Sequence, residues 1–417
     1  MSELRAPPGT KDVLPPESAR WAQLVGCFAH RAGLAGYGLV VSPMFEDVTV
    51  FSRVGEETDV VRKEMYDFLD KGGRRLALRP EGTASVVRAF VQHRPLVPFK
   101  AWYAAPSFRY ERPQAGRYRQ HHQLGVEALG SDDPELDVEV VATAYAVCTA
   151  DVGLAGVSLL LTSLGDAQCR PAYLEALALF LKDGTDLLCT EHRERALVNP
   201  LRVLDCKRPE CVAATAGAPR LLDNLCPACA DHFGQVRAGL EALGVPYTLA
   251  PRLVRGLDYY TRTTFELQAT ALGSAQDAVG GGGRYDGLVE AMGGPPTAGI
   301  GFGLGIERLL LAADAEGSFA GPDATVDVWV VDTAGGSDAT VLARDLREAG
   351  IATDRSFGGR SMKAQLKSAD RSGARLALIV GQREVAGGTV GVKDLAEGTQ
   401  DTVDRHQVVA AVRERLA

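Results

Sequence analysis

Three short segments of the sequence combine arginine with a constrained backbone, a combination suited to binding phosphate. The first, residues 107–120, reads "SFRYERPQAGRYRQ", and in it four arginines surround one acid: Arg109, Arg112, Arg117, Arg119 and Glu111. On paired strands Arg109 and Glu111 would point to the same face, because strand side chains alternate. The planar guanidinium group suits bidentate contacts to phosphate oxygens. A charged surface hairpin is the alternative for this segment.

The second segment, "GIGFGLGIERLLL", has glycines that alternate strictly at positions 299, 301, 303 and 305. In a strand these glycines share one face, and interior glycine weakens a strand unless a ligand or another backbone approaches closely. A flat aromatic group such as adenine would fit against that face, and tight packing of the strand is the alternative. Glu307 and Arg308 follow where the strand passes into a helix, and from there Arg308 would reach a phosphate group.

The third segment, "LVRGLDYYTRTTFE", places Arg255, Tyr259 and Tyr260 just before an alternating, β-branched run. Acceptor groups that would meet the same ligand occur elsewhere in the chain: Glu81, Thr83, Gln123 and Glu127. Gln123 and Glu127 are separated by an even number of residues, so on a strand they share a face. Such acceptors would suit a ligand with donor groups, such as an ammonium and an imidazole.

The composition is that of an ordinary globular protein, with 46% hydrophobic and 24% charged residues. A chain of 417 residues is long enough for two or three domains. It has no apolar run of the roughly 18 residues that span a bilayer and no signal-peptide pattern, so we expect a cytoplasmic protein with no membrane segment. A net charge of −8 disfavours non-specific nucleic-acid binding over the whole surface but allows a local basic surface.

The first 325 residues favour antiparallel strands with attached helices. Residues 17–36 have helical periodicity, and the strand-like run that follows is interrupted at Pro43, which predicts a sheet edge or an interface. "RRLALRPEGTASVVRAFV" predicts a strand, a turn and a helix, and two strands flank the loop around "RPQAGRYR". From about 168 to 247 the sequence changes to segments rich in leucine and alanine, which indicates an inserted helical subdomain.

The last part of the chain, residues 326–417, alternates strand and helix patterns and predicts a compact α/β domain. Within it Lys363, Lys367 and Arg371 are spaced by four and share one helical face, with Arg360 just before them. Like charges at this spacing destabilise an isolated helix, and an RNA backbone would relieve the repulsion. A solvated helix face is the alternative.

Four cysteines in the helical part approach the spacing of zinc ligands: Cys206, Cys211, Cys226 and Cys229. They form a C-x4-C pair and a C-x2-C pair, and His232 follows three residues later. This spacing predicts one structural zinc site, with reduced free thiols as the alternative. The remaining cysteines, at 27, 148, 169 and 189, are interpreted as small buried residues.

Several of these segments resemble histidyl-tRNA synthetases, a family of class II aminoacyl-tRNA synthetases, and the similarity covers nearly the whole chain. "FRYERPQAGRYRQHHQLGVE", "GFGLGIERL" and the segment ending near Pro43 resemble the three class motifs. "LVRGLDYY" and "GGRYDGL" resemble the signatures specific to the histidine enzyme, and "GGRSMKAQLKSADRSGA" resembles part of the family's anticodon-binding domain. The resemblance implies an α+β catalytic domain, an antiparallel sheet flanked by helices, with a helical insertion, and a C-terminal α/β anticodon-binding domain.

The resemblance also implies a reaction, in which ATP with Mg²⁺ activates L-histidine and the histidyl group passes to the 3′ end of tRNA(His). Arg109 and Arg255 would act at the α-phosphate as the catalytic pair. The histidine site would comprise Glu81, Gly82, Thr83, Arg109, Gln123, Glu127, Arg255, Tyr259, Tyr260 and Tyr285, with Arg284 nearby. The ATP site would comprise Arg109, Glu111, Arg117, His121, Glu307 and Arg308. Contacts to tRNA would come from Arg112, Gln114, Arg360, Lys363, Lys367 and Arg371.

The family is generally homodimeric, and the Pro43 edge is the one hint of a dimer in this sequence. The main alternative is a catalytically inactive relative that serves as a regulatory subunit in histidine biosynthesis or as a sensor of uncharged tRNA. The regulatory relatives lack the anticodon-binding domain and lose the arginines and "LVRGLDYY", all of which are present here. The sensors are fused to a kinase, for which this sequence has no signature.

Overall fold

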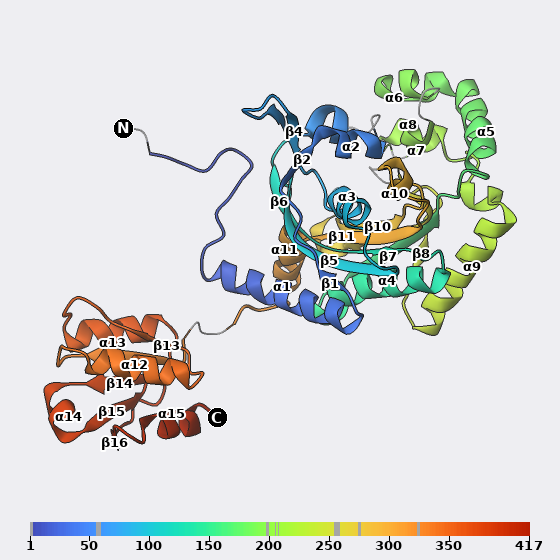
Figure 1. The fold of residues 1–417 in the computed structure, drawn as a ribbon. Helices are drawn as coiled ribbons and strands as arrows, with labels where there is room; N and C mark the ends of the chain where they lie inside the picture. Colours follow the sequence, from blue (N-terminus) through green and yellow to red (C-terminus); the bar gives the residue numbers. More distant parts are fainter. Residues whose placement is uncertain are drawn as a thin grey trace. The chain divides into compact units, whose positions relative to one another are not determined.

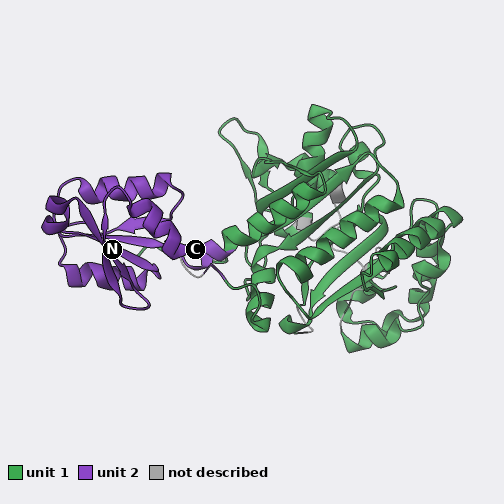
Figure 2. Ribbon diagram, turned by 90° about the horizontal axis from the view of Figure 1, so that it is seen from below, with its two compact units in different colours: residues 1–14, 21–320 green, residues 15–20, 321–417 purple. Residues whose placement is uncertain are grey.

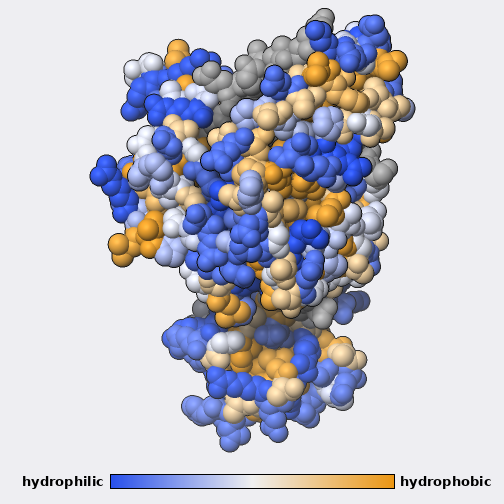
Figure 3. Space-filling model, turned by 90° about the vertical axis from the view of Figure 1, so that its right-hand side faces the viewer, coloured by the Kyte–Doolittle hydropathy of each residue, from blue (hydrophilic) through white to orange (hydrophobic). Residues whose placement is uncertain are grey.

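The computed structural model describes residues 3–55, 60–196, 200–204, 206, 208–253, 259–273, 277–322 and 326–417. The chain forms two compact units, residues 1–14 with 21–320 and residues 15–20 with 321–417 (Figures 1 and 2). None of the described helices combines the length and apolar composition needed to span a bilayer. On the face drawn in Figure 3, apolar residues occur in patches between hydrophilic ones.

The first unit is built on an eight-stranded sheet with the order β1-β5-β6-β11-β10-β9-β7-β8. Its central strands are antiparallel, whereas β1 runs parallel to β5 and β8 parallel to β7, so the sheet is mixed rather than wholly antiparallel. The strands are β1 Gly38–Leu39, β5 Phe99–Phe108, β6 Gln120–Leu129, β7 Val157–Ser163, β8 Thr248–Leu249, β9 Thr261–Ala269, β10 Ala278–Arg284 and β11 Gly299–Gly305.

The two faces of this sheet have different roles, and β6 shows the division. Leu124, Val126 and Ala128 are fully buried on one face, where they pack against Leu24 and Phe28 of α1. That face is covered by α1 Glu17–Leu34, α4 Pro134–Ala146 and α11 Ile306–Glu316 (Figure 1). The opposite face, which carries the polar residues of β6, lies beneath α3 Thr83–His93 and α10 Leu288–Ala291. Alternation along one strand therefore separates the core from the polar face.

A three-stranded sheet, β2-β4-β3, lies beside the N-terminal edge of the large sheet. Pro43 falls in the irregular segment between β1 and β2, and the buried Arg79 ties this segment to β5. Its guanidinium donates to the carbonyl of Pro106 at 2.6 Å and to the hydroxyl of Ser42 at 2.9 Å. The elements are β2 Phe45–Asp47, α2 Val48–Gly55, the π-helical turn Val60–Glu64, β3 Asp67–Leu69 and β4 Arg75–Leu78.

The segment between β7 and β8 consists mainly of helices, which lie to one side of the large sheet (Figure 1). Most of them have only five or six residues, too few to be stable without tertiary contacts. They are α5 Arg170–Asp183, α6 Thr190–Arg195, α7 Pro200–Leu204, α8 Pro209–Ala214 and α9 Pro227–Ala242, with 3₁₀ turns at Thr185–Leu187 and Leu221–Asn224. Two further helical turns elsewhere in the unit span Val147–Asp151 and Thr270–Leu272.

The second unit has a five-stranded sheet with the order β13-β12-β14-β15-β16. The first three strands in this order are parallel, and β15 and β16 add antiparallel edges. The strands are β12 Val328–Asp332, β13 Thr353–Arg355, β14 Leu376–Val380, β15 Thr389–Asp394 and β16 Gln400–Asp404. The helices are α12 Asp338–Glu348, α13 Met362–Arg371, α14 Gln382–Gly387 and α15 Val408–Leu416.

Candidate functional site

The centre of the candidate site is the carboxylate of Glu127, which lies near the C-terminal end of β6 and is fully buried. Three hydroxyl groups donate to it: Thr83 at 2.7 Å and Tyr103 at 3.2 Å donate to Oε1, and Tyr285 donates to Oε2. Burial raises the pKa of Glu127 to about 8, although the hydroxyl hydrogen bonds act in the opposite direction. The pocket is therefore built to hold this carboxyl group in one orientation.

A second buried carboxylate, that of Glu81, lies at the start of α3. Its two oxygens accept the backbone N–H groups of Thr83 at 2.7 Å and Ala84 at 2.8 Å, two donors that the helix itself leaves unsatisfied. Burial raises the pKa of Glu81, and the charge of Glu81 contributes to the raised pKa of Glu127. Two buried carboxyl groups that repel one another favour the binding of a cation between them.

Tyr103 on β5 belongs to this site and was missed by the sequence analysis. Its ring lies against two glycines, Gly82 and Gly125, at either of which a Cβ atom would overlap the ring. Gly125 is the direct partner of Tyr103 across the β5–β6 ladder. The sequence signal was an aromatic residue facing a glycine on the paired strand, which becomes visible only once the register is known. Gly82, predicted as a site residue, therefore makes room for a wall of the pocket.

Three tyrosines form another wall of the pocket. The ring of Tyr259 lies 4.8 Å from that of Tyr260 and 5.8 Å from that of Tyr285, measured between centroids. The hydroxyl of Tyr259 is buried, and none of the residues that the structure describes forms a hydrogen bond with it. A buried hydroxyl without a partner is costly, so this atom marks a place for a polar ligand group. Arg255, predicted to lie beside these tyrosines, is outside the described residues.

The alternating glycines of β11 face the protein's own side chains. Gly301 pairs with Glu127 across the ladder, and a Cβ atom on Gly301 would overlap Glu127 Oε2. A Cβ atom on Gly303 would lie 3.1 Å from the side-chain nitrogen of Gln123. The expectation that these glycines leave a bare face for a flat ligand is therefore wrong at Gly301. There the missing side chain makes room for the pocket carboxylate.

A cluster of arginines lies beyond Gln123, where β5 ends and β6 begins. The guanidinium of Arg109 donates to the carbonyl of Pro80 at 2.9 Å, and that of Arg117 pairs with Glu111 at 2.7 Å. His121 lies among these groups: burial, followed by the charges of Arg109 and its neighbours, lowers its pKa to about 3. The imidazole of His121 is thus neutral near pH 7 and leaves the positive charge to the arginines.

Arg308 brings a further guanidinium to this cluster from the first turn of α11. Its Nε donates to the carbonyl of Ala278, and burial together with the charge of Arg117 lowers its pKa. Gly116, at the tip of the hairpin between β5 and β6, lies so near that a Cβ atom there would be 3.6 Å from Arg308 Cγ. Several arginines that repel one another around one space form a site suited to a polyphosphate.

Glu307, predicted to contact a nucleotide, is engaged with the protein instead. Its carboxylate accepts the backbone N–H of His122 at 3.0 Å and lies 2.9 Å from the ring nitrogen Nδ1 of the same residue. The His122 ring stacks edge-on against Trp21, with centroids 4.9 Å apart. His121 and His122 therefore point to opposite faces of β6, and only His121 faces the arginine cluster.

Arg284 does not lie in the pocket, in contrast to the prediction that placed it near the site. Its fully buried guanidinium forms an ion pair with Asp137 of α4 at 2.6 Å and with Asp286 at 3.1 Å. Arg284 and Tyr285 are consecutive, so their side chains point to opposite faces of the sheet. Tyr285 faces Glu127, and Arg284 holds α4 against the other face.

The predicted RNA-facing residues are exposed. Arg112 and Gln114 lie in the hairpin loop, whose tip is closed by backbone hydrogen bonds between Gln114 and Arg117 at 2.9 and 3.0 Å. In the second unit Arg360, Lys363, Lys367 and Arg371 are all exposed, and no ion pair joins them to a described acid. The buried side chain of Gln365 fixes α13 through two hydrogen bonds to Asp332. Its oxygen accepts the backbone N–H of Asp332 at 2.8 Å, and its nitrogen donates to the backbone carbonyl of Asp332 at 2.6 Å.

The four cysteines predicted to share one zinc ion do not come together. Cys206 and Cys211 lie with Cys189 and His192, whereas Cys226 and Cys229 lie with Cys169 and Asp166. His232, considered as a further ligand, lies 3.6 Å from Asp137 instead. Cys169 and Cys189, interpreted from the sequence as small buried residues, are therefore members of these two groups. The sequence spacing identified the pairs correctly but not which residues complete each group.

Comparison with known proteins gives matches along almost the whole chain. A family model of histidyl-tRNA synthetase matches residues 9–309, and an anticodon-binding domain model matches residues 326–415. A histidine–tRNA ligase of Rhodococcus erythropolis is 52% identical, over 98% of this chain and 97% of the relative. One of Mycobacterium marinum is also 52% identical, over 100% of both chains.

Solved structures lead to the same family. The apo histidyl-tRNA synthetase of S. aureus has a TM-score of 0.82 and 36% identity, covering 98% of this chain and 100% of that one. A Bacillus halodurans structure titled as an ATP phosphoribosyltransferase regulatory subunit/histidyl-tRNA synthetase is 20% identical with a TM-score of 0.64, which shows a shared fold alone. With two matching family models and relatives 52% identical over the full length, this chain belongs to the histidyl-tRNA synthetase family.

Proposed function

We propose that this chain is a histidine–tRNA ligase, which forms histidyl-adenylate from L-histidine and ATP and transfers the histidyl group to the 3′ end of tRNA(His). The observation that carries the proposal is the buried Glu127 carboxylate, held by three hydroxyl groups next to an arginine cluster on the same β5–β6 hairpin. Such a pair of subsites suits a small molecule with a basic ring at one end and a carboxylate activated by a nucleotide at the other.

In this proposal the histidine side chain enters the tyrosine-walled pocket. Glu127 and Tyr260 bond the two imidazole nitrogens, and Tyr259 and Tyr285 line the ring. The unpartnered Tyr259 hydroxyl supports a polar ligand atom at this position. A site whose buried groups need both ring nitrogens rejects isosteres that lack them by large factors.

The α-ammonium group of histidine binds at the start of α3, in a subsite made by Glu81, Gly82, Thr83 and Gln123. The charge of Glu81 contributes to the raised pKa of Glu127, and this excess of negative charge supports a cation beside Glu81. While Glu127 bonds the imidazole ring, an ammonium group beside Glu81 replaces that repulsion with attraction and anchors the amino acid. Its carboxylate is then directed toward Arg109.

ATP, as its Mg²⁺ complex, binds at the arginine cluster. Arg109 and Arg255 hold the α-phosphate, Arg117 and Arg308 hold the β- and γ-phosphates, and Glu111, His121 and Glu307 lie around the nucleotide. The lowered pKa of Arg308, caused in part by Arg117, supports an anion at this position, because a phosphate relieves that repulsion. Glu307 would keep its contact with His122 and act on the nucleotide through the position of β6.

The chemistry requires positioning and charge stabilisation more than proton transfer. The histidine carboxylate is already a nucleophile, and its oxygen attacks the α-phosphorus as the bond to pyrophosphate breaks. In the second step a terminal ribose hydroxyl of tRNA attacks the histidyl carbonyl, and AMP leaves. Arginines fixed by protein carbonyl groups, as Arg109 is by Pro80, suit the first step because they need little reorganisation.

The tRNA contacts come from two separate parts of the chain. The exposed Arg112 and Gln114 of the hairpin loop contact the acceptor end, and the basic row on α13 contacts the anticodon arm. Three cations spaced by four on one helix face, without acidic partners among the described residues, support binding to a polyanion.

In this proposal the catalytic domain covers residues 1–325 with its insertion at about 168–247, and the anticodon-binding domain covers residues 326–417.

The active form is a cytoplasmic homodimer in this proposal. Four apolar side chains around Pro43 are at least half exposed: Leu39, Val41, Met44 and Phe45. An exposed apolar patch on the irregular edge segment suits contact with a second copy of the chain. Light scattering on the purified protein measures this directly, and a monomer at micromolar concentration would count against it.

The decisive experiment is histidine-dependent ATP–pyrophosphate exchange, followed by charging of tRNA(His). We expect exchange with histidine alone among the amino acids, and near-complete loss in Arg255→Ala with folding retained. Exchange with another amino acid and none with histidine would contradict the specificity. An inactive regulatory or sensor protein would show no exchange at all, and the 52% identity to histidine–tRNA ligases over the full chain favours the active enzyme.

A further inference from the structure

The chain between β7 and α9 brings metal-ligating side chains into two separate groups of four. We propose that each group binds one Zn²⁺ ion as a structural site. The first site consists of Cys189, His192, Cys206 and Cys211, and the second of Asp166, Cys169, Cys226 and Cys229. In each group one potential ligand atom per residue lies within 4.8 Å of all the others.

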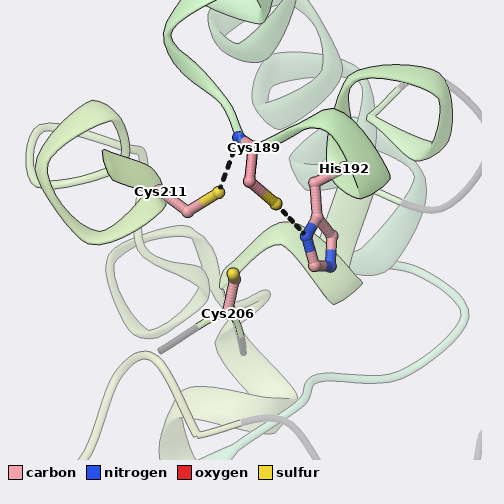
Figure 4. A group of neighbouring side chains, drawn as sticks. All are labelled: Cys189, His192, Cys206 and Cys211. Atoms are coloured by element: carbon pink, nitrogen blue, oxygen red, sulfur yellow. Dashed lines mark hydrogen bonds between the residues drawn. The ribbon is translucent and has the colours of Figure 1, made fainter. Parts of the chain in front are cut away.

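The first site has the dimensions of a tetrahedral zinc centre. Figure 4 shows its four side chains converging on one space from α6, α8 and the segment after α7. The Sγ atom of Cys189 lies 3.0 Å from Nδ1 of His192, and Sγ of Cys211 accepts the backbone N–H of Cys189 at 3.2 Å. Sulfur and nitrogen ligands of one tetrahedral zinc lie about 3.4–3.8 Å apart, so small movements would complete the coordination.

The second site joins the start of the helical segment to its end. Cys169 is the residue before α5, and its Sγ lies 3.3 Å from Asp166 Oδ1. Cys226 is the residue before α9, and its backbone N–H donates to the Sγ of Cys169 at 3.3 Å. Cys229 follows in the first turn of α9. Three sulfurs and one carboxylate oxygen form a ligand set that zinc accepts.

The sequence spacing within each group supports a metal. Each site combines two short-spaced pairs: Asp166-x2-Cys169 with Cys226-x2-Cys229, and Cys189-x2-His192 with Cys206-x4-Cys211. Structural zinc sites are assembled from such pairs, and soft thiolate ligands in tetrahedral arrangement select zinc. All eight cysteines are free thiols, and the two outside these groups, Cys27 and Cys148, precede the segment 166–229 that contains both groups. Six cysteines gathered in two groups are therefore better explained by a metal than by free thiols.

The two metal sites would stabilise the short helices of this segment. The first connects α6, α7 and α8, which have six, five and six residues. Helices of this length are not stable alone, and a structural metal replaces part of the missing core. Four protein ligands leave no open position for a reacting water molecule, so these sites are structural rather than catalytic.

The second site also has a connection to the tyrosine pocket. Arg170, next to Cys169, donates to the backbone carbonyl of Tyr260 at 3.2 Å. Arg262, which lies just beyond Tyr260, reaches Asp166 at 3.7 Å. Loss of the metal from this site is therefore expected to disturb the position of Tyr260, whereas loss from the first site is not.

Metal analysis of the full-length protein, purified without chelators, tests the proposal. We expect two zinc ions per chain in the wild type, one in Cys206→Ser/Cys211→Ser, one in Cys226→Ser/Cys229→Ser, and two in the control Cys27→Ser. Less than about 0.2 zinc per chain in the wild type would overturn both sites. One zinc per chain in the wild type would overturn one of them, and the paired variants would identify which.

Two further measurements keep the test informative where a serine variant fails to fold. Replacing zinc by cobalt in the wild type should give the visible absorption of tetrahedral cobalt with thiolate ligands, and its absence would contradict the geometry. His192→Cys and Asp166→Cys supply an equivalent ligand and should each retain two metals, while His192→Ala and Asp166→Ala should lose metal to a chelator faster. Equal retention in the alanine and cysteine variants would remove these two residues from the ligand sets.

Discussion

Glu127 occupies the space that a side chain on Gly301 would need, because the two residues are directly paired across β6 and β11. The absence of a side chain on one strand is thus a condition for the pocket carboxylate on the other. A glycine at this position serves recognition and not turn geometry, since Gly301 lies in the interior of a strand.

Gly301→Ala should therefore strongly reduce histidine activation. The added methyl group would overlap Glu127 Oε2 and the backbone carbonyl of Val126, so the carboxylate must move. Loss of a hydrogen bond to a charged group costs about 1.5–3 kcal/mol, which corresponds to about a 10- to 150-fold loss of exchange activity. Gly303→Ala is the matched control with a smaller loss, because its neighbour is the flexible end of Gln123. Equal activities in the two variants would contradict this account.

The stability of the ligand-free protein should fall with rising pH because of Glu127. Its pKa is raised from 4.5 to about 8, so the folded protein holds a proton that the unfolded chain releases. This contribution is complete below about pH 4.5 and is lost as pH rises through about 8, with a slope of at most about 1.4 kcal/mol per pH unit. Glu127→Gln, which cannot titrate, should lack this component. Urea unfolding midpoints between pH 5 and 8.5 compare the two proteins, and parallel profiles would refute the prediction.

Arg308→Ala should weaken the use of ATP more than the use of histidine. Removing a charge-assisted contact of about 1.5–3 kcal/mol predicts a rise of about 10-fold or more in KM for ATP. The KM for histidine should change little, because the tyrosine-walled pocket does not include Arg308. Arg74→Ala, which removes an exposed arginine paired with Asp70 within the same unit, is the control and should change neither value. Exchange kinetics with each substrate varied in turn separate these outcomes.

The basic row on α13 should matter for tRNA and not for amino-acid activation. Lys367→Glu, and more strongly Lys363→Glu/Lys367→Glu, should raise KM for tRNA in charging assays and weaken its salt dependence. Exchange activity, which needs no tRNA, should stay at the wild-type level. Arg383→Glu on α14 makes the same charge change on another exposed residue of the unit and serves as the control. A loss of equal size in Arg383→Glu would indicate a general charge effect instead of a binding face.

Removing Arg284 should destabilise the first unit strongly. Arg284 and Asp137 are both fully buried and 2.6 Å apart, so Arg284→Ala leaves the buried Asp137 carboxylate without its guanidinium partner. Breaking such a pair costs about 3–5 kcal/mol. Arg344→Ala, which removes an exposed arginine that pairs with Asp345, should have a much smaller effect on stability. Denaturant unfolding measures both. A small effect in Arg284→Ala would show that Asp137 finds another partner.

Local patterns predicted the parts of the site that lie on one strand. The even spacing of Gln123 and Glu127 places both on one face of β6, as the structure shows. The same rule would have placed Arg284 opposite Tyr285, although the prediction kept them together. Tyr103 was beyond such reasoning, because its role depends on Gly125 of the neighbouring strand and on Gly82 at the start of α3.

The remaining differences between the predictions and the structure occur where tertiary contacts determine which residues meet. The two cysteine pairs were recognised from their spacing, but their partners lie up to 63 residues away along the chain, and the spacing within a pair does not indicate which distant residues complete the group. In the second unit α14 and β16 were not predicted. α14 has only six residues, and β16 is a polar edge strand whose pairing with β15 determines its conformation.

The two oxygens of Glu81 stabilise the first turn of α3 while they line the pocket. The same carboxylate therefore has two roles, and a change at Glu81 that affects one of them also affects the other. A residue that replaced Glu81 and capped the helix equally well would still remove this carboxylate from the pocket wall. Glu81 therefore cannot be replaced to improve stability without changing the binding site. Conversely, an inhibitor that draws the Glu81 carboxylate toward itself would loosen the first turn of α3, and that loosening would be measurable by amide hydrogen exchange at Thr83 and Ala84.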